Sequence, residues 1–151
     1  MSSHIARICA LSFLVLGSLS GVACADEIEV KMLNTDGEGQ RMLFQPGFVK
    51  AKVGDTIKFV PTEKPHNAES IPELWPEGVP TFKGPLNEEV SFKIEKPGIY
   101  GIKCMPHYGM GMIGLVVAGD ELPNKAQLES YKPRGKESIK RFTELKAQVG
   151  Q

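Results

Sequence analysis

Residues 104–112 of this 151-residue chain read Cys-Met-Pro-His-Tyr-Gly-Met-Gly-Met and lie between two apolar runs that are typical of β-strands. The stretch brings together a thiol, an imidazole and a thioether, from Cys104, His107 and Met112. One more histidine would complete the set of two imidazoles, one thiolate and a weak axial methionine that suits copper cycling between Cu(I) and Cu(II). The chain offers that histidine at His66. We therefore predict a site for one copper ion.

Two neighbouring features fit this prediction. Cys104 falls at the end of an expected buried strand, and a metal that it binds would deprotonate it, because the thiolate is the ligand. Asn67 directly follows His66. We expect its side chain to tie the His66 segment to the Cys104 loop by hydrogen bonds.

The first 25 residues read as a secretory signal and are set apart from the fold. A short basic start precedes an apolar run over residues 8–19, which is shorter than the roughly 20 residues of a membrane-spanning helix. Residues 23–25 read Ala-Cys-Ala, as at a signal-peptidase site. We expect cleavage after Ala25, which leaves one exported domain over residues 26–151 and no membrane anchor. A lipid anchor on Cys24 is an alternative that explains the same residues less well.

The charge and cysteine counts narrow the class of protein. The chain carries 18 Lys+Arg and 18 Asp+Glu, so it has no net positive charge of the kind that attracts nucleic acid. Of its 3 cysteines, Cys9 and Cys24 fall in the predicted leader, which leaves Cys104 alone. A lone cysteine in an oxidising compartment has no internal disulfide partner, and a free thiol there is a liability. A bound metal would protect it.

Most of the remaining chain alternates polar and apolar residues with a period of two between turn residues, which is typical of half-buried strands. The strands expected before the metal-binding stretch cover residues 28–32, 42–44, 49–53, 57–60, 90–94 and 99–104. Residues 113–118 form a continuous apolar run, which predicts a further strand that is covered on both sides. Residues 61–85 contain six prolines and no sustained period, so we expect an irregular loop with one helical turn at 71–75. Short strands with regular turn signals predict an antiparallel or mixed β-sandwich.

Two helices are expected in a tail that starts at about residue 123. Asn124 and Gln127 resemble a capping box for the first helix, which Pro133 ends. Residues 136–149 have the apolar stripe of an amphipathic helix, which we expect to lie against the sandwich. Its expected apolar stripe consists of Ile139, Phe142, Leu145 and Val149.

Other classes of protein would use some of the same residues. Taken singly, a loop histidine is commonly solvated, a methionine commonly fills a gap in a core, and a lone cysteine is commonly inert. A structural zinc module could use His66, Cys104 and His107, but zinc seldom recruits a thioether. A cysteine hydrolase needs a third group that orients its Cys–His pair. A copper carrier or storage protein would use the same ligands without fast electron exchange.

The chain resembles the cupredoxins, the small blue copper proteins, and within them the pseudoazurin group. The resemblance covers nearly all of residues 26–151 and rests on Cys104-x2-His107-x4-Met112, on the segments 66–72 and 76–78, on Lys103 and on the helical tail. It implies a Greek-key β-sandwich with two C-terminal helices. It also implies a monomeric periplasmic electron carrier, not an enzyme, that donates to copper nitrite reductase or a related denitrification reductase.

The resemblance further implies roles for residues around the predicted ligands. The edge of His107 would be the exit for the electron, with Asn67 and Met42 beside the ligands. An apolar docking patch would consist of Pro106, Tyr108 and Met110 together with Met42 and Pro61. Lys64, Lys83 and Lys103 would form a ring that meets an acidic partner, which speeds association and makes it salt-sensitive. Ordinary solvated lysines are the alternative, and Thr35 stands near where the family often has a further lysine.

Overall fold

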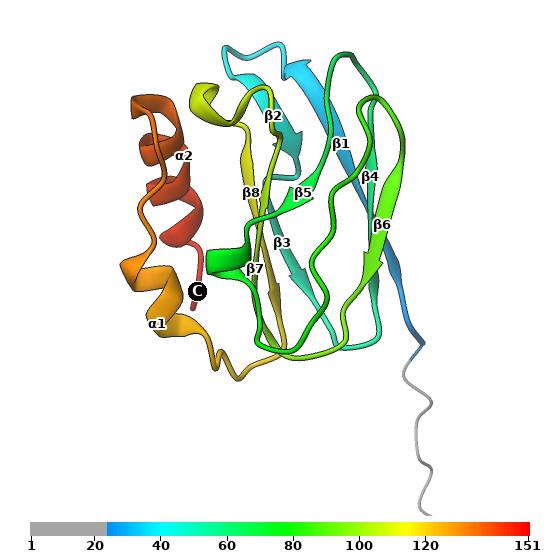
Figure 1. Cartoon of the computed structure of the whole chain (residues 1–151), viewed down its shortest axis with the longest axis vertical. Coiled ribbons are helices and arrows are strands. Elements are labelled where there is room, and N and C mark those ends of the chain that lie inside the picture. Colours follow the sequence, from blue (N-terminus) through cyan, green and yellow to red (C-terminus); the bar gives the residue numbers. More distant parts are fainter. Residues whose placement is uncertain (1–23) are drawn as a thin grey trace, which may run out of the picture.

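The computed structural model describes residues 24–151, so nearly all of the predicted leader lies outside it. Two four-stranded sheets face each other, and both C-terminal helices lie against the outer face of one of them (Figure 1). The strands are β1 (Glu27–Thr35), β2 (Arg41–Gln45), β3 (Phe48–Ala51), β4 (Thr56–Val60), β5 (Glu69–Ser70), β6 (Val90–Lys93), β7 (Gly98–Lys103) and β8 (Ile113–Ala118). This confirms the predicted β-sandwich with a helical tail.

The strand order shows how the chain crosses between the sheets. The first sheet has the order β2-β1-β4-β6 and the second has the order β3-β8-β7-β5. β1 pairs with β4 and β3 pairs with β8 in parallel, while the other pairs are antiparallel. The sandwich is therefore mixed, as in the Greek-key arrangement that the resemblance implied.

Two hydrophobic clusters lie on either side of the second sheet. The cluster between the sheets contains Met112 and Val116, and the cluster under the helices contains Ile113 and Leu115. Successive residues of β8 thus point to opposite clusters, because side chains alternate along a strand. All of β8 is buried, which confirms the sequence-based expectation of a strand covered on both sides.

The long connection between β4 and β6 is largely irregular, as predicted. Its helical turn is the 3-10 helix η1 (Pro72–Leu74). The sequence pattern does not predict the two-residue strand β5, in which Glu69 pairs with Lys103 and Ser70 with Ile102 of β7. The Ser70 hydroxyl also bonds both backbone groups of Phe82, each at 3.0 Å. These contacts fix the segment that carries His66 beside the end of β7.

The tail forms the helices α1 (Lys125–Ser130) and α2 (Lys136–Lys146), and its details correct two predictions. α2 ends before Val149, although this residue still packs partly buried against the cluster under the helices, and Ile139 is 51% exposed and lies outside the buried stripe. Ser138 is buried instead of Ile139, because its hydroxyl bonds the carbonyl oxygen of Tyr108 and the Ser138 side of α2 therefore faces the sandwich. Among residues 24–151 no helix has the length and apolar character needed to cross a bilayer.

Asn124 does not form the predicted capping box. Its side-chain oxygen accepts from the backbone N–H of Ile99 at 2.8 Å, and its amide nitrogen donates to the Ile99 carbonyl at 2.7 Å. A Cβ at Gly98, where φ is +142°, would lie 2.9 Å from the Asn124 Oδ1 atom. Because the amide is engaged by β7, it joins the start of the tail to the sandwich instead of capping α1.

Replacement of Asn124 by alanine should lower the free energy of unfolding by about 1–3 kcal/mol, because both buried backbone groups of Ile99 lose their partner. Chemical denaturation of the two proteins measures this change. Lys125→Ala alters the adjacent exposed position and should be nearly neutral. If Asn124→Ala is as stable as Lys125→Ala, the amide link does not stabilise the tail.

Candidate metal centre

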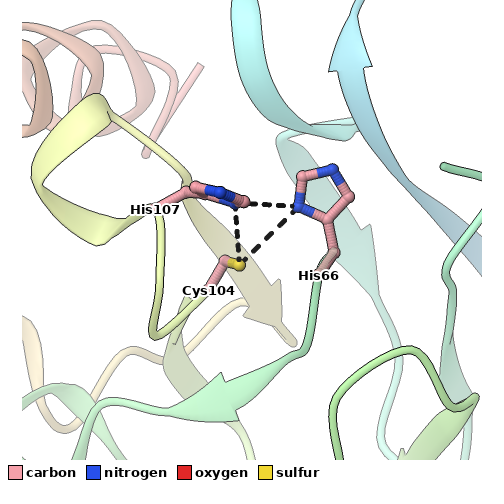
Figure 2. Close-up of side chains that lie close together, drawn as sticks. All are labelled: His66, Cys104 and His107. Carbon is pink, nitrogen blue, oxygen red and sulfur yellow. Dashed lines mark hydrogen bonds between the residues drawn. The ribbon is translucent and has the colours of Figure 1, made fainter. Parts of the chain in front are cut away.

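The predicted ligands come from separate parts of the chain that meet at one end of the sandwich. His66 precedes β5, Cys104 directly follows β7, and His107 precedes the 3-10 helix η2 (Tyr108–Met110). Met112 is the residue before β8. Figure 2 shows the side chains of His66, Cys104 and His107 pointing toward one another.

Three potential ligand atoms converge in this cluster. The Nδ1 atoms of His66 and His107 lie 3.1 Å apart, and the Cys104 Sγ atom lies 3.8 Å and 3.7 Å from them. The two rings are nearly perpendicular, at 72°. Two ring nitrogens that face each other this closely need a proton or a cation between them, since two lone pairs repel. With the nearby sulfur, the geometry fits a single soft metal ion.

Burial disfavours the charged forms of the His66 and Cys104 side chains unless a metal is bound. His66 and Cys104 are fully buried, and the His66 Nε2 atom has no hydrogen-bond partner among the described residues. Burial raises the pKa of the Cys104 thiol, although backbone N–H groups of Asn67 and His107 oppose this shift. Burial, and then the charge of His107, lowers the pKa of His66. In the absence of metal, Cys104 is therefore a thiol at neutral pH and His66 is a neutral imidazole.

Met112 is held next to the cluster by the backbone. The Cys104 N–H donates to the Met112 carbonyl at 3.0 Å, and the Met112 N–H donates to the His107 carbonyl at 3.2 Å. Met112 is fully buried in the same hydrophobic cluster as Cys104. The structure thus brings the thioether residue to the predicted site.

Asn67 joins the two ligand segments. Its side-chain oxygen accepts from the Met105 N–H at 2.8 Å, and its amide nitrogen donates to Glu69 Oε1 and to the Gly84 carbonyl, both at 3.0 Å. Gly84 has to be a glycine, because a Cβ there would lie 2.8 Å from the carbonyl oxygen of Ala68. These bonds match the link that the sequence suggested for Asn67.

Sequence reasoning missed two residues that hold the site. Glu69 is buried and bonds Asn67. Asn87 accepts from the His66 N–H at 3.2 Å and returns a hydrogen bond to the His66 carbonyl at 2.7 Å. Asn87 has a φ of +64°, a conformation that asparagine tolerates better than most residues, but the sequence alone does not reveal this backbone angle.

Several of the predicted docking residues are neighbours of His107 in the sequence, and the His107 side chain itself is half-buried. Pro106 is exposed and Met110 is 50% exposed, while Met105, which the sequence reasoning left out, is 64% exposed. Tyr108 is half-buried against the tail, with its hydroxyl 2.6 Å from that of Tyr131. The exposed apolar side chains closest to His107 in the sequence are therefore those of Met105, Pro106 and Met110.

The remaining predicted surface residues differ in exposure. Lys64 and Lys83 are exposed, whereas Lys103 is half-buried with its ammonium 5.9 Å from the centre of the Tyr108 ring. Met42 packs partly buried against the cluster between the sheets. Pro61 is half-buried, and Thr35 is exposed at the end of β1.

Comparison with known proteins gives consistent matches. The model of the copper binding proteins, plastocyanin/azurin family, matches residues 30–119. A pseudoazurin of Paracoccus pantotrophus is 54% identical over 96 residues, which is 64% of this chain and 66% of the relative. A pseudoazurin of Methylorubrum extorquens is 46% identical over 127 residues, 84% of each chain. The crystal structure of pseudoazurin from Hyphomicrobium denitrificans superposes with a TM-score of 0.78 at 52% identity, covering 83% of this chain and 99% of the other.

Metal binding should release about one proton per ion at pH 7. The raised pKa keeps the Cys104 thiol protonated until a metal displaces the proton from its sulfur. Cd²⁺ serves as a redox-inert soft ion, and an indicator dye in weak buffer measures the protons released. Affinity should rise about tenfold per pH unit between pH 7 and 8, since the competing proton becomes scarcer.

Two controls complete this experiment. Mg²⁺, a hard ion, should release no protons. Cys104→Ser should lose the proton release, because a serine hydroxyl is not deprotonated under these conditions. Cd²⁺ binding to the wild type without proton release would mean that the Cys104 thiolate is not a ligand.

Proposed function

The chain belongs to the plastocyanin/azurin family of copper-binding proteins and, within it, to the pseudoazurins, and from that premise we propose that it carries single electrons in the periplasm to copper nitrite reductase or a related denitrification reductase. The family consists of blue copper electron-transfer proteins, and this chain is an electron carrier rather than an enzyme. Its cofactor is copper. The ligand assignment, the partner and the compartment are the proposed parts.

One observation carries the proposal: two imidazole nitrogens and one thiol sulfur converge within 4.8 Å in a buried cluster. We assign His66, Cys104 and His107 as ligands of one copper ion, and Met112 as the weak axial ligand. The donor set fits copper, because thiolate and thioether are soft ligands and imidazole suits both oxidation states. When bound, copper supplies a one-electron couple between Cu(I) and Cu(II).

The residues of the chain keep the site rigid and dry. Asn67 and Asn87 fix the His66 segment, and backbone bonds fix Met112 against Cys104. Ligands that keep their places during electron transfer reduce the reorganisation that accompanies it. Because His66 and Cys104 are fully buried, the half-buried edge of His107 is the proposed route for the electron.

The surface around His107 supports brief docking. The exposed side chains of Met105, Pro106 and Met110 can exclude water from a contact without a deep interface. The exposed Lys64 and Lys83 would steer an acidic partner toward this face. Such a contact suits a monomer that exchanges partners quickly.

The periplasmic location is supported by the leader-like sequence of residues 1–25. β1 begins at Glu27, directly after the proposed cleavage point at Ala25. Residues 26–151 would then form the mature domain.

The copper-loaded oxidised protein should have an intense visible thiolate-to-copper band, and Cys104→Ser should abolish it. Met112→Leu should keep the colour but raise the reduction potential measured by voltammetry, because loss of a donor to Cu(II) favours Cu(I). Colour that persists in Cys104→Ser would disprove the thiolate assignment. An unchanged potential in Met112→Leu would remove Met112 from the site.

Stopped-flow mixing of the reduced, copper-loaded protein with purified copper nitrite reductase tests the partner. Lys64→Ala and Lys83→Ala should each lower the bimolecular rate about two- to fivefold at low salt, and the difference should shrink at high salt. Lys93→Ala is the matched control, because this exposed lysine pairs with Thr56 at the far end of β6 (Figure 1).

Two results would count against this proposal. Equal effects of all three lysine substitutions would argue against the proposed docking face. Absence of electron transfer to the reductase, in a protein that binds copper, would favour the alternative of a copper carrier or storage protein.

A further inference from the structure

The helical tail lies outside the part of the chain that the family model describes, which ends at residue 119. α2 nevertheless packs against η2, the short turn between His107 and Met112 (Figure 1). This turn has no strand partner and is preceded and followed by proposed copper ligands. The contacts between tail and turn therefore bear on the site.

Tyr108, the first residue of the turn, is bound by the tail at two points. Its hydroxyl lies 2.6 Å from the hydroxyl of Tyr131, in the link between α1 and α2. Its carbonyl oxygen accepts a hydrogen bond from the hydroxyl of Ser138, a fully buried residue of α2. Burial raises the pKa of Tyr131, so its hydroxyl stays neutral. Side chain and backbone of Tyr108 are thus both held from the tail.

The backbones of tail and turn also approach closely. A Cβ at Gly135 would lie 3.0 Å from the Gly109 carbonyl oxygen, and one at Gly111 would lie 3.2 Å from the Glu137 carbonyl oxygen. Both glycines have positive φ, at +92° and +95°. The N-terminal end of α2 therefore packs directly on the turn, with little room between them.

The held residue determines the path of the chain between the two proposed ligands. The Tyr108 carbonyl accepts from the Gly111 N–H at 3.1 Å as well as from Ser138. The neighbouring His107 carbonyl accepts from the Met112 N–H at 3.2 Å. A shift of Tyr108 would therefore move both His107 and Met112.

We propose that Tyr131 and Ser138 are positioning residues, which hold the turn through Tyr108 and thereby set the geometry of His107 and Met112. The inference rests on the proposed function insofar as His107 and Met112 bind copper. The competing explanation is that the tail only covers the apolar outer face of β8, in which case loss of either hydroxyl would alter global stability and nothing at the site.

Amide hydrogen exchange in the metal-free full-length protein tests the first half of the proposal and does not depend on copper. Tyr131→Phe and Ser138→Ala each remove one hydroxyl, and each should speed exchange at the Gly111 and Met112 amides about two- to tenfold, the size expected for one hydrogen bond. The double variant should show a larger effect. Unchanged exchange at both amides in the double variant would overturn the proposal.

Tyr100→Phe is the matched control. It removes the hydroxyl that bonds, at 2.6 Å, the carbonyl of Lys96, a residue that precedes β7, and this hydroxyl is bonded to no residue of the turn. It should lower the denaturation midpoint without changing exchange at Gly111 or Met112. If Tyr100→Phe speeds these amides as much as Tyr131→Phe does, the effect is one of global stability and the proposal fails.

The copper-loaded protein tests the second half. Tyr131→Phe and Ser138→Ala should shift the reduction potential and the relative intensities of the visible bands, whereas Tyr100→Phe should leave both as in the wild type. Faster exchange without any change in potential or spectrum would show that the tail orders the turn but does not position the ligands. That result would also overturn the proposal, while leaving the electron-carrier function intact.

Discussion

The rest of this structure depends on two ring nitrogens and a thiol sulfur that are brought together away from water. The Nδ1 atoms of His66 and His107 are 3.1 Å apart, and the Cys104 sulfur is less than 4 Å from each. Without a shared proton or cation the contact between the two ring nitrogens is repulsive, and burial penalises charge on His66 and on Cys104. Folding must therefore supply the force that keeps them together, and it does so through the surrounding backbone.

Strand pairing and hydrogen bonds in both segments that carry the proposed ligands hold the three groups together. Pairing of β5 with β7 brings the His66 segment beside the end of β7, and the Asn67 side chain closes the remaining gap to Met105. Hydrogen bonds of Cys104 and Met112 tie the other segment to itself before β8 begins. The site is thus an extension of the sheet pairing rather than a flexible loop that closes around a ligand. Such a construction fits the proposed electron transfer, which requires ligands that keep their positions when the oxidation state changes.

The alternation of β8 connects the site with the tail. Met112 and Val116 face the cluster between the sheets, while Ile113 and Leu115 face the helices. The tail that covers the second cluster consequently reaches the turn just before β8, where Ser138 bonds Tyr108. A segment that adds hydrophobic cover to the sandwich is therefore also in contact with the residues between the ligands. The contact between Ser138 and Tyr108 thus connects the tail with the segment between the proposed ligands.

Local sequence was sufficient for the strands other than β5, for the presence of two tail helices and for the types of the proposed ligands. The period-two pattern and the spacing from Cys104 to Met112 are properties of neighbouring residues, and so they can be read along the chain. The convergence of His66 with Cys104, the short strand β5, and the contributions of Glu69 and Asn87 depend on contacts between distant residues. Sequence patterns also misplaced Ile139 and Asn124, because helical periodicity and capping preference are weaker than a buried hydrogen bond to Tyr108 or Ile99. The sequence alone thus determined which types of donor group the chain offers to a metal. Their arrangement in space was decided only when the two sheets and the tail packed together, because it depends on contacts between distant residues.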